Sequence, residues 1–216
     1  MIVFVTGAIL LLQGSLRRST GPSWYQENMV YLPRGEQLKP ALLGFETTVA
    51  HYLWIRMVLY FGGHYITDKQ YVWLISMLDA ITRLCPYFYS AYEFAGLMVP
   101  DVCDNPEAAR ILLERGMTYV EKQKDLLAFQ MGMIFYRYYD DRKTAALCFE
   151  RGAHSKGKHA YKLARLASTF YSQAGIPAEG LQVLMFAWET SDNPDVRRHL
   201  AEKINMLQRE MAEKRK

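Results

Sequence analysis

Cysteine is scarce in this chain of 216 residues, which has only Cys85, Cys103 and Cys148. The three form neither a CxxC nor a CxxCH motif. Their odd number and wide spacing give none of the usual signatures of a disulfide framework, a zinc ribbon or a c-type haem attachment site. Because Cys148 stands beside Phe149 on an expected packing face, we expect it to be a buried structural thiol.

A strong excess of one charge is also lacking. The sequence has 26 Lys and Arg residues against 22 Asp and Glu residues, a net charge of +4, and no single basic block. We therefore expect no nucleic-acid partner. Half of the residues are hydrophobic and 22% are charged, which excludes a disordered tail, a collagen-like fibre and a simple charged coiled coil.

Catalytic and cofactor-binding motifs are missing as well. The sequence contains no GxSxG, P-loop or dinucleotide-binding fingerprint. His51 and His64 lie about 220° apart around an expected helix, so they cannot act as an i, i+4 pair of metal ligands. His154 and His159 stand in a lysine-containing turn, which we interpret as solvated, with an anion or lipid-headgroup contact as the alternative. The sequence predicts a non-enzymatic protein without a metal, a cofactor or a small-molecule substrate.

No hydrophobic run of the roughly 20 residues that cross a bilayer is found at the N-terminus. The apolar run there covers Ile2 to Leu16, lacks basic residues before it and is followed by Arg17 and Arg18. It fits a short or tilted membrane anchor, the tail of a longer signal or anchor, or an apolar segment docked on the rest of the chain. We predict that residues 1–18 attach the protein to a membrane. The arginines favour a cytoplasmic body, but a basic segment upstream would reverse that orientation, so the side stays open.

Alternating strand patterns and NG or DG hairpin turns are absent too. Residues 19–40 contain several prolines and glycines and predict an irregular leader. From residue 41 to residue 216 the apolar residues have helical spacing between widely separated prolines. The sequence therefore predicts an all-α domain over 41–216. Its last segment, from Asp192, has one apolar face suited to cap the end of a helical array, formed by Val196, Leu200, Ile204, Leu207 and Met211.

A repeat of 35–36 residues runs through this domain. The sequence LLERG at Leu112–Gly116 returns as CFERG at Cys148–Gly152. Small and bulky residues recur at this period. The small residues form three sets, Gly96, Gly132 and Ala167, then Ala109, Ala145 and Gly180, and then Gly116, Gly152 and Ala187. The bulky residues are Leu113, Phe149 and Leu184. Small residues opposite bulky ones let two antiparallel helices approach closely, so each unit is expected to be a helix hairpin that stacks on the next.

This pattern resembles the tetratricopeptide repeat (TPR), a 34-residue helix–turn–helix unit. The resemblance covers about residues 47–190, with Phe135 and Phe170 at the aromatic position of the first helix. It departs from the family in its longer period and in its lack of the early tryptophan, where Tyr92, Ala128 and Leu163 stand instead. The apolar N-terminal segment and the leader are also similar to poorly characterised bacterial membrane-anchored TPR proteins. The resemblance implies a right-handed α-solenoid.

The resemblance also implies a concave groove lined by first-helix residues. Carried over to this chain, the partner-binding candidates are Glu93, Phe129, Met133, Tyr136, Arg137, Tyr161, Ser168 and Tyr171, next to Ser90, Leu97, Leu126 and Ala164. Tyr, Met and Arg are enriched in protein interfaces. The alternative for each of these residues is packing between helices, because large rings dominate core burial.

The first expected helix, about residues 41–65, is apolar on too many sides for an exposed helix. It is expected either to be buried under the leader and the first repeat or to lie against the membrane or a partner subunit. Its interface candidates are Tyr52, Trp54, Tyr60 and Tyr65. The leading hypothesis is a membrane-anchored TPR-like adaptor that binds a partner protein, itself membrane-associated, in the aromatic groove. The alternative is an accessory subunit of a larger membrane complex, held through this first helix.

Overall fold

The structure is a computed structural model that describes residues 35–155 and 157–213. All regular elements within these ranges are helices, which confirms the all-α prediction. They are α2 (Gly35–Leu38), η2 (Lys39–Ala41), α3 (Glu46–Ile66), α4 (Leu74–Leu84), α5 (Tyr89–Val102), α6 (Pro106–Tyr119), α7 (Lys124–Tyr139), α8 (Arg142–Ala153), α9 (Ala160–Gln173), α10 (Pro177–Thr190) and α11 (Pro194–Glu213). The predicted anchor, residues 1–18, and most of the leader lie outside the described residues.

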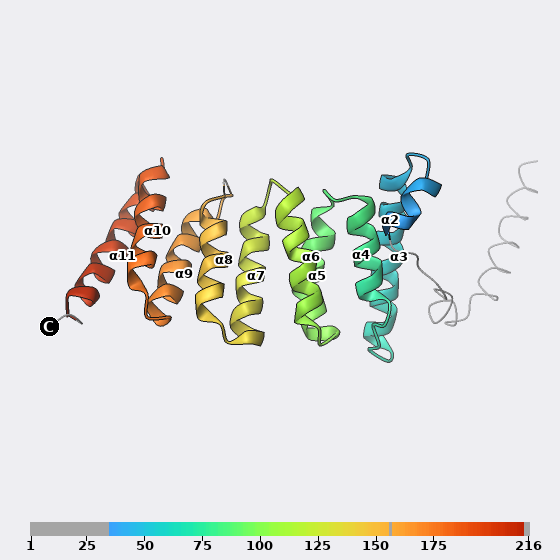
Figure 1. The fold of residues 1–216 in the computed structure, drawn as a ribbon, viewed down its shortest axis with the longest axis horizontal. Helices are drawn as coiled ribbons and strands as arrows, with labels where there is room; N and C mark the ends of the chain where they lie inside the picture. Colours follow the sequence, from blue (N-terminus) through green and yellow to red (C-terminus); the bar gives the residue numbers. More distant parts are fainter. Residues whose placement is uncertain (1–34, 156, 214–216) are drawn as a thin grey trace, which may run out of the picture.

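The helices pack in sequential pairs and form a helical array. Helix α3 packs on α4, α5 on α6, α7 on α8 and α9 on α10, while α5 also contacts α7. Figure 1 shows the helices side by side in chain order along the long axis, each running across it. The α3 end and the α11 end of the array are therefore far apart, and α3 has no described helix beyond it except the short α2 and η2.

Short turns with recognisable residues separate the paired helices. Asn105 caps α6, since its side chain accepts a hydrogen bond from the Ala108 N–H at 2.9 Å, and Asp141 caps α8 through the Thr144 N–H at 2.9 Å. Gly175 has a φ of 81°, which favours glycine, and helix α10 starts directly after this turn. Side-chain caps therefore begin the second helix of the α5–α6 and α7–α8 hairpins, and a glycine turn precedes that of the α9–α10 hairpin.

Two glycines show why the repeat pattern produces close helix packing. A Cβ atom at Gly132 in α7 would lie 2.3 Å from the Phe149 ring in α8. A Cβ atom at Gly116 in α6 would lie 2.8 Å from the Tyr92 ring in α5. Only glycine fits at either position, so the predicted apposition of small and bulky residues is confirmed at both hairpins.

Polar contacts also join equivalent helices of successive hairpins. The Arg115 guanidinium in α6 donates to the Asp79 carboxylate in α4 at 2.8 Å and to the Thr82 hydroxyl at 2.7 Å. Arg151 in α8 lies 3.2 Å from Glu114 in α6. The Arg115 and Asp79 side chains are 16% and 28% exposed, so this pair is the better shielded of the two.

The Asp79 pair gives the array a pH-dependent stability. Burial raises the pKa of this carboxyl, but hydrogen bonds from Arg83 and Arg115 outweigh that effect and hold the pKa below its usual 3.8. Because the pKa of Asp79 is lower in the folded protein than in the unfolded chain, its ionised carboxylate stabilises the fold at pH values above the unfolded-state pKa. This stabilisation is lost as the pH falls through the folded-state pKa. We expect the stability difference between wild type and Asp79→Asn, measured by denaturant unfolding, to shrink as the pH drops below about 4. A difference that stays constant down to strongly acidic pH would contradict this role of Asp79.

The two ends of the domain differ from each other. At the C-terminal end, Leu200 and Leu207 of α11 are buried and their apolar neighbours on that helix pack against the same core, as predicted. At the N-terminal end, residues 35–41 form the short helices α2 and η2, so this part of the leader is helical where irregular chain was predicted. Helix α2 packs on α4 and leaves one side of α3 uncovered.

Candidate functional site

Helix α7 presents the central part of the predicted groove. Phe129, Met133, Tyr136 and Arg137 follow one another at spacings of four, three and one residues, so they share one helix face. Phe129 and Tyr136 are 41% and 39% exposed, and Met133 is half-buried. Exposed rings of this size, with Met133 between them and Arg137 at the end of the same face, are typical of a binding surface.

A cavity of about 210 Å³ lies between this face of α7 and helix α5. Three of the predicted residues, Phe129, Met133 and Arg137, line it. The remaining lining residues are Gly96, Leu97, Pro100, Asp101, Gln130, Ile134 and Tyr138. We call this cavity, together with the exposed Tyr136 on the same face of α7, the α5–α7 groove.

A small polar cluster occupies one end of the groove. The Arg137 guanidinium lies 3.6 Å from the Asp101 carboxylate and 5.4 Å from the centre of the Tyr138 ring. The Tyr138 hydroxyl donates to Asp101, and burial together with this bond raises the pKa of Tyr138. Arg137 and Asp101 are each about half exposed, so their pairing contributes little to stability and Arg137 can exchange Asp101 for another carboxylate.

Gln130 is a groove residue that the sequence pattern did not reveal. Its side chain is 8% exposed, and its Nε2 donates to the Glu93 carbonyl in α5 at 3.4 Å. Its Oε1 has no hydrogen-bond partner in the part of the chain that the structure describes. A Cβ atom at Gly96 would lie 2.3 Å from that oxygen, so the absent side chain at Gly96 makes room for the amide. Nothing in the periodicity marks a glutamine as buried, because glutamine is common on exposed faces.

Two of the predicted groove residues lie in the core of the array. Ser168 is buried and donates to the Arg165 carbonyl at 2.9 Å. Tyr171 is 2% exposed, and its hydroxyl donates to Glu150. Burial and this carboxylate raise the pKa of Tyr171. Neither side chain is available to a partner in this structure, so the candidate surface leaves them out.

Glu93 and Tyr161 lie at the margins of the surface. Glu93 accepts a hydrogen bond from the Tyr89 hydroxyl at 2.8 Å within α5. Tyr161 in α9 lines a separate cavity of about 660 Å³ beside the turn between α8 and α9, together with Lys158 and Phe186. The predicted groove residues therefore do not form one continuous surface. The largest group of them that shares one face is on α7.

The four interface candidates of the first helix fall into two pairs that differ in exposure. Tyr52 and Tyr65 are exposed on α3. Trp54 and Tyr60 face inward. The Trp54 ring lies 5.3 Å from that of Phe88, and the Tyr60 hydroxyl accepts from the Trp73 N–H at 3.2 Å. These two residues join α3 to the following helices and are only partly exposed.

A larger cavity, of about 780 Å³, lies on the opposite side of α7, where it meets α6 and α8. Its apolar lining residues are Met117, Met131, Phe135, Leu147 and Cys148. Burial raises the pKa of the Cys148 thiol to about 11, so this cysteine stays protonated and unreactive at neutral pH. Cys148 is buried, as the sequence predicted.

The histidines of α3 take part in local contacts. The His51 ring stacks on Phe88 with the ring centres 4.8 Å apart, and His64 Nδ1 lies 2.5 Å from the Asp68 carboxylate. Within the described ranges, no three potential His, Cys, Asp or Glu ligands gather to hold a metal ion. Among the helices described, none combines the length and the apolar character needed to cross a membrane.

Comparison of the chain with protein-family models, with curated proteins and with solved structures finds no match.

Proposed function

We propose that this chain is a non-enzymatic, TPR-like adaptor that holds a segment of a partner protein in the α5–α7 groove. The observation that carries the proposal is the groove itself, where exposed Phe129 and half-exposed Arg137 border a cavity between two successive first helices. The repeat period and the glycine contacts support assignment to right-handed TPR-like hairpins. In this proposal the N-terminal apolar segment keeps the adaptor and its membrane-associated partner at the membrane.

The size and chemistry of the groove indicate what kind of segment it binds. Its volume of about 210 Å³ is below the roughly 300–1,000 Å³ of sites for drug-sized ligands, so it suits an inserted apolar side chain. Arg137 at its end suits a carboxylate, which would replace Asp101 as its ion partner. The proposed ligand is therefore a peptide segment with an apolar residue close to an acidic one.

The proposal is tested by capture of partners on three forms of the full chain, extracted from membranes in mild detergent. They are the wild type, the groove variant Phe129→Ala/Tyr136→Ala/Arg137→Ala, and a matched control. We expect the groove variant to recover at least roughly tenfold less of a specific partner, because aromatic and Arg residues are the usual binding hot spots.

The control variant removes three exposed apolar side chains from second helices, Ile111→Ala/Leu147→Ala/Met185→Ala. It should retain the partner, and both variants should show the wild-type helical circular dichroism signal. Equal recovery by the groove variant and the wild type would contradict the proposal. A loss confined to the control variant would place binding on the opposite side of the array.

A further inference from the structure

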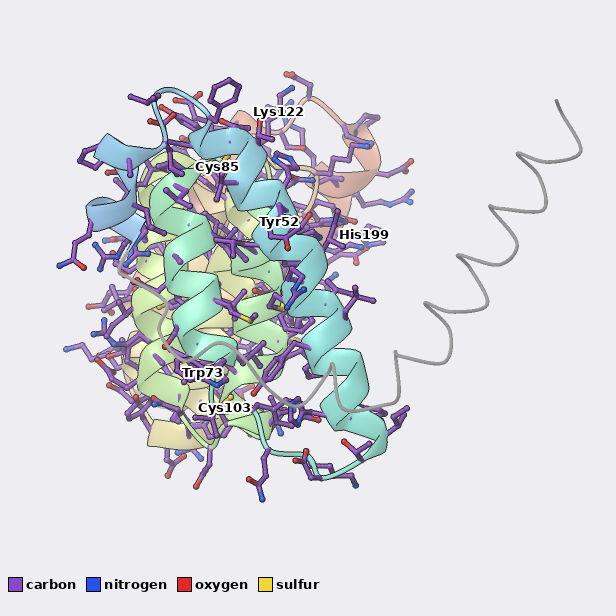
Figure 2. The ribbon with its side chains drawn as sticks, turned by 90° about the vertical axis from the view of Figure 1, so that its right-hand side faces the viewer. Tyr52, Trp73, Cys85, Cys103, Lys122 and His199 are labelled. Carbon is purple, nitrogen blue, oxygen red and sulfur yellow. The ribbon has the colours of Figure 1, made fainter. Side chains whose placement is uncertain are left out.

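The outer face of α3 is an uncovered apolar stripe at the N-terminal end of the array. Tyr52, Ile55, Leu59 and Ile66 follow the spacing of one helix face and are all exposed, Ile55 by 58% and Ile66 by 82%. Phe45, directly before the helix, extends the stripe. Figure 2 views the array from this end, with α3 in front and Tyr52 on it. In the described part of the chain, no helix packs on this stripe.

The opposite face of α3 belongs to the protein core. Ala50, Leu53 and Met57 are buried there against the helices that follow. Helix α3 therefore cannot be surrounded by lipid, and whatever covers its outer face must approach from one side only. The other end of the array differs, because α11 buries one apolar stripe and has charged residues elsewhere. Terminal elements of a helical array need such a polar outer face to stay in water, whereas the outer face of α3 is mainly apolar.

We propose that the outer face of α3 lies in the headgroup region of a lipid bilayer, as a second membrane contact that fixes the orientation of the array. This inference rests on the proposed attachment of the N-terminal segment to the membrane. One segment alone would leave the array free to rotate about the leader. With α3 on the bilayer as well, the α3 end of the array faces the membrane and the α5–α7 groove keeps a fixed distance from it.

The length of the leader supports lipid as the occupant. Residues 17–34 separate the apolar N-terminal run from the first described residue, and these 18 residues span at most about 60 Å. Helix α3, with 21 residues, is about 31 Å long. A bilayer that holds the N-terminal run is therefore always within reach of α3.

The composition of the face supports the same occupant. Aliphatic side chains at Ile55 and Leu59 follow the amphipathic ring of Tyr52, and tyrosine rings prefer the headgroup level of a membrane. Arg56 is exposed beside the stripe and forms no ion pair within residues 35–155 and 157–213. Glu46, in the first turn, is the one acidic residue of α3. An apolar face with an unpaired arginine at its margin suits a surface that contains anionic phospholipid.

The test places a genetically encoded, environment-sensitive fluorophore at Ile55 of the full chain. The chain is reconstituted into vesicles of phosphatidylcholine and phosphatidylglycerol, with and without lipids brominated in the upper acyl chain. A matched probe at Ile111, an exposed isoleucine of α6, serves as the control. We expect bromolipid to quench the Ile55 probe at least about threefold more than the Ile111 probe, since an interfacial helix buries its apolar face about 5–10 Å into the headgroup and acyl boundary.

Each other outcome overturns the inference. A blue-shifted Ile55 probe without bromolipid quenching would mean that protein covers α3, either a second copy of the chain or its own N-terminal segment. An Ile55 probe with the emission of water-exposed fluorophore would mean that nothing covers it. Flotation of the vesicles separates these results from a failure of the proposed anchoring. A chain that floats without quenching contradicts only the α3 contact, whereas a chain that does not float contradicts the membrane attachment itself.

Discussion

Replacement of Gly132 by alanine is expected to lower the free energy of unfolding by about 2 kcal/mol or more. The added Cβ would lie 2.3 Å from one carbon of the Phe149 ring and 2.7 Å from two others. Phe149 is fully buried, so its ring cannot turn away without disturbing the α7–α8 hairpin. The expected decrease in melting temperature, roughly 4–8 °C for a chain of this size, is measurable by circular dichroism of the full chain in detergent.

Gly62→Ala is the matched control for this substitution. Gly62 lies inside α3, and a Cβ atom there would meet nothing within 4 Å. Since alanine favours a helix interior over glycine by about 1 kcal/mol, this variant should be slightly more stable than the wild type. Equal effects of the two substitutions would contradict the close packing of α7 on α8.

Phe149→Ala is expected to have the largest effect on stability, a loss of about 3–5 kcal/mol. The ring fills the space opposite Gly132 and lies edge-on to Phe170 of α9, with the ring centres 5.1 Å apart. Its removal leaves a cavity at the junction of two successive hairpins. Denaturant unfolding of the variant beside the wild type measures the loss.

The two substitutions should be strongly coupled. Without the Phe149 ring, the three atoms nearest to the added Cβ at position 132 are gone, so Gly132→Ala should be neutral or slightly stabilising in the Phe149→Ala background. A double-mutant cycle measures this coupling directly. If Gly132→Ala has the same cost in both backgrounds, the clash with Phe149 is not its cause.

Much of the fold could be predicted because its signals are local. Asn105 and Asp141 at the starts of α6 and α8, and glycines opposite bulky residues, mark the α5–α6 and α7–α8 hairpins in the sequence itself. The stripe that joins α11 to the core is equally visible as a helical period. These features depend on neighbours within one hairpin, so the sequence alone reveals them.

The exposure of individual groove residues could not be predicted in the same way. Tyr136 and Tyr171 are 35 residues apart and occupy equivalent repeat positions. Tyr136 stands edge-on to Phe170 and is partly exposed, whereas Tyr171 is buried and donates to Glu150. The difference comes from contacts between hairpins, which the repeat period does not encode. Contacts between hairpins also determine the burial of Gln130 and the cavity beside Met131, so the repeat period predicts neither.

The central claim is that the α5–α7 groove contacts a partner protein, and site-specific photo-crosslinking in living cells tests it most directly. A photoreactive amino acid replaces Tyr136 in the groove or Leu147 on the opposite side, two positions of similar exposure. The account predicts that the Tyr136 probe forms an adduct with one defined protein and that the Leu147 probe does not. Adducts at Leu147 alone, or none at Tyr136, would contradict it.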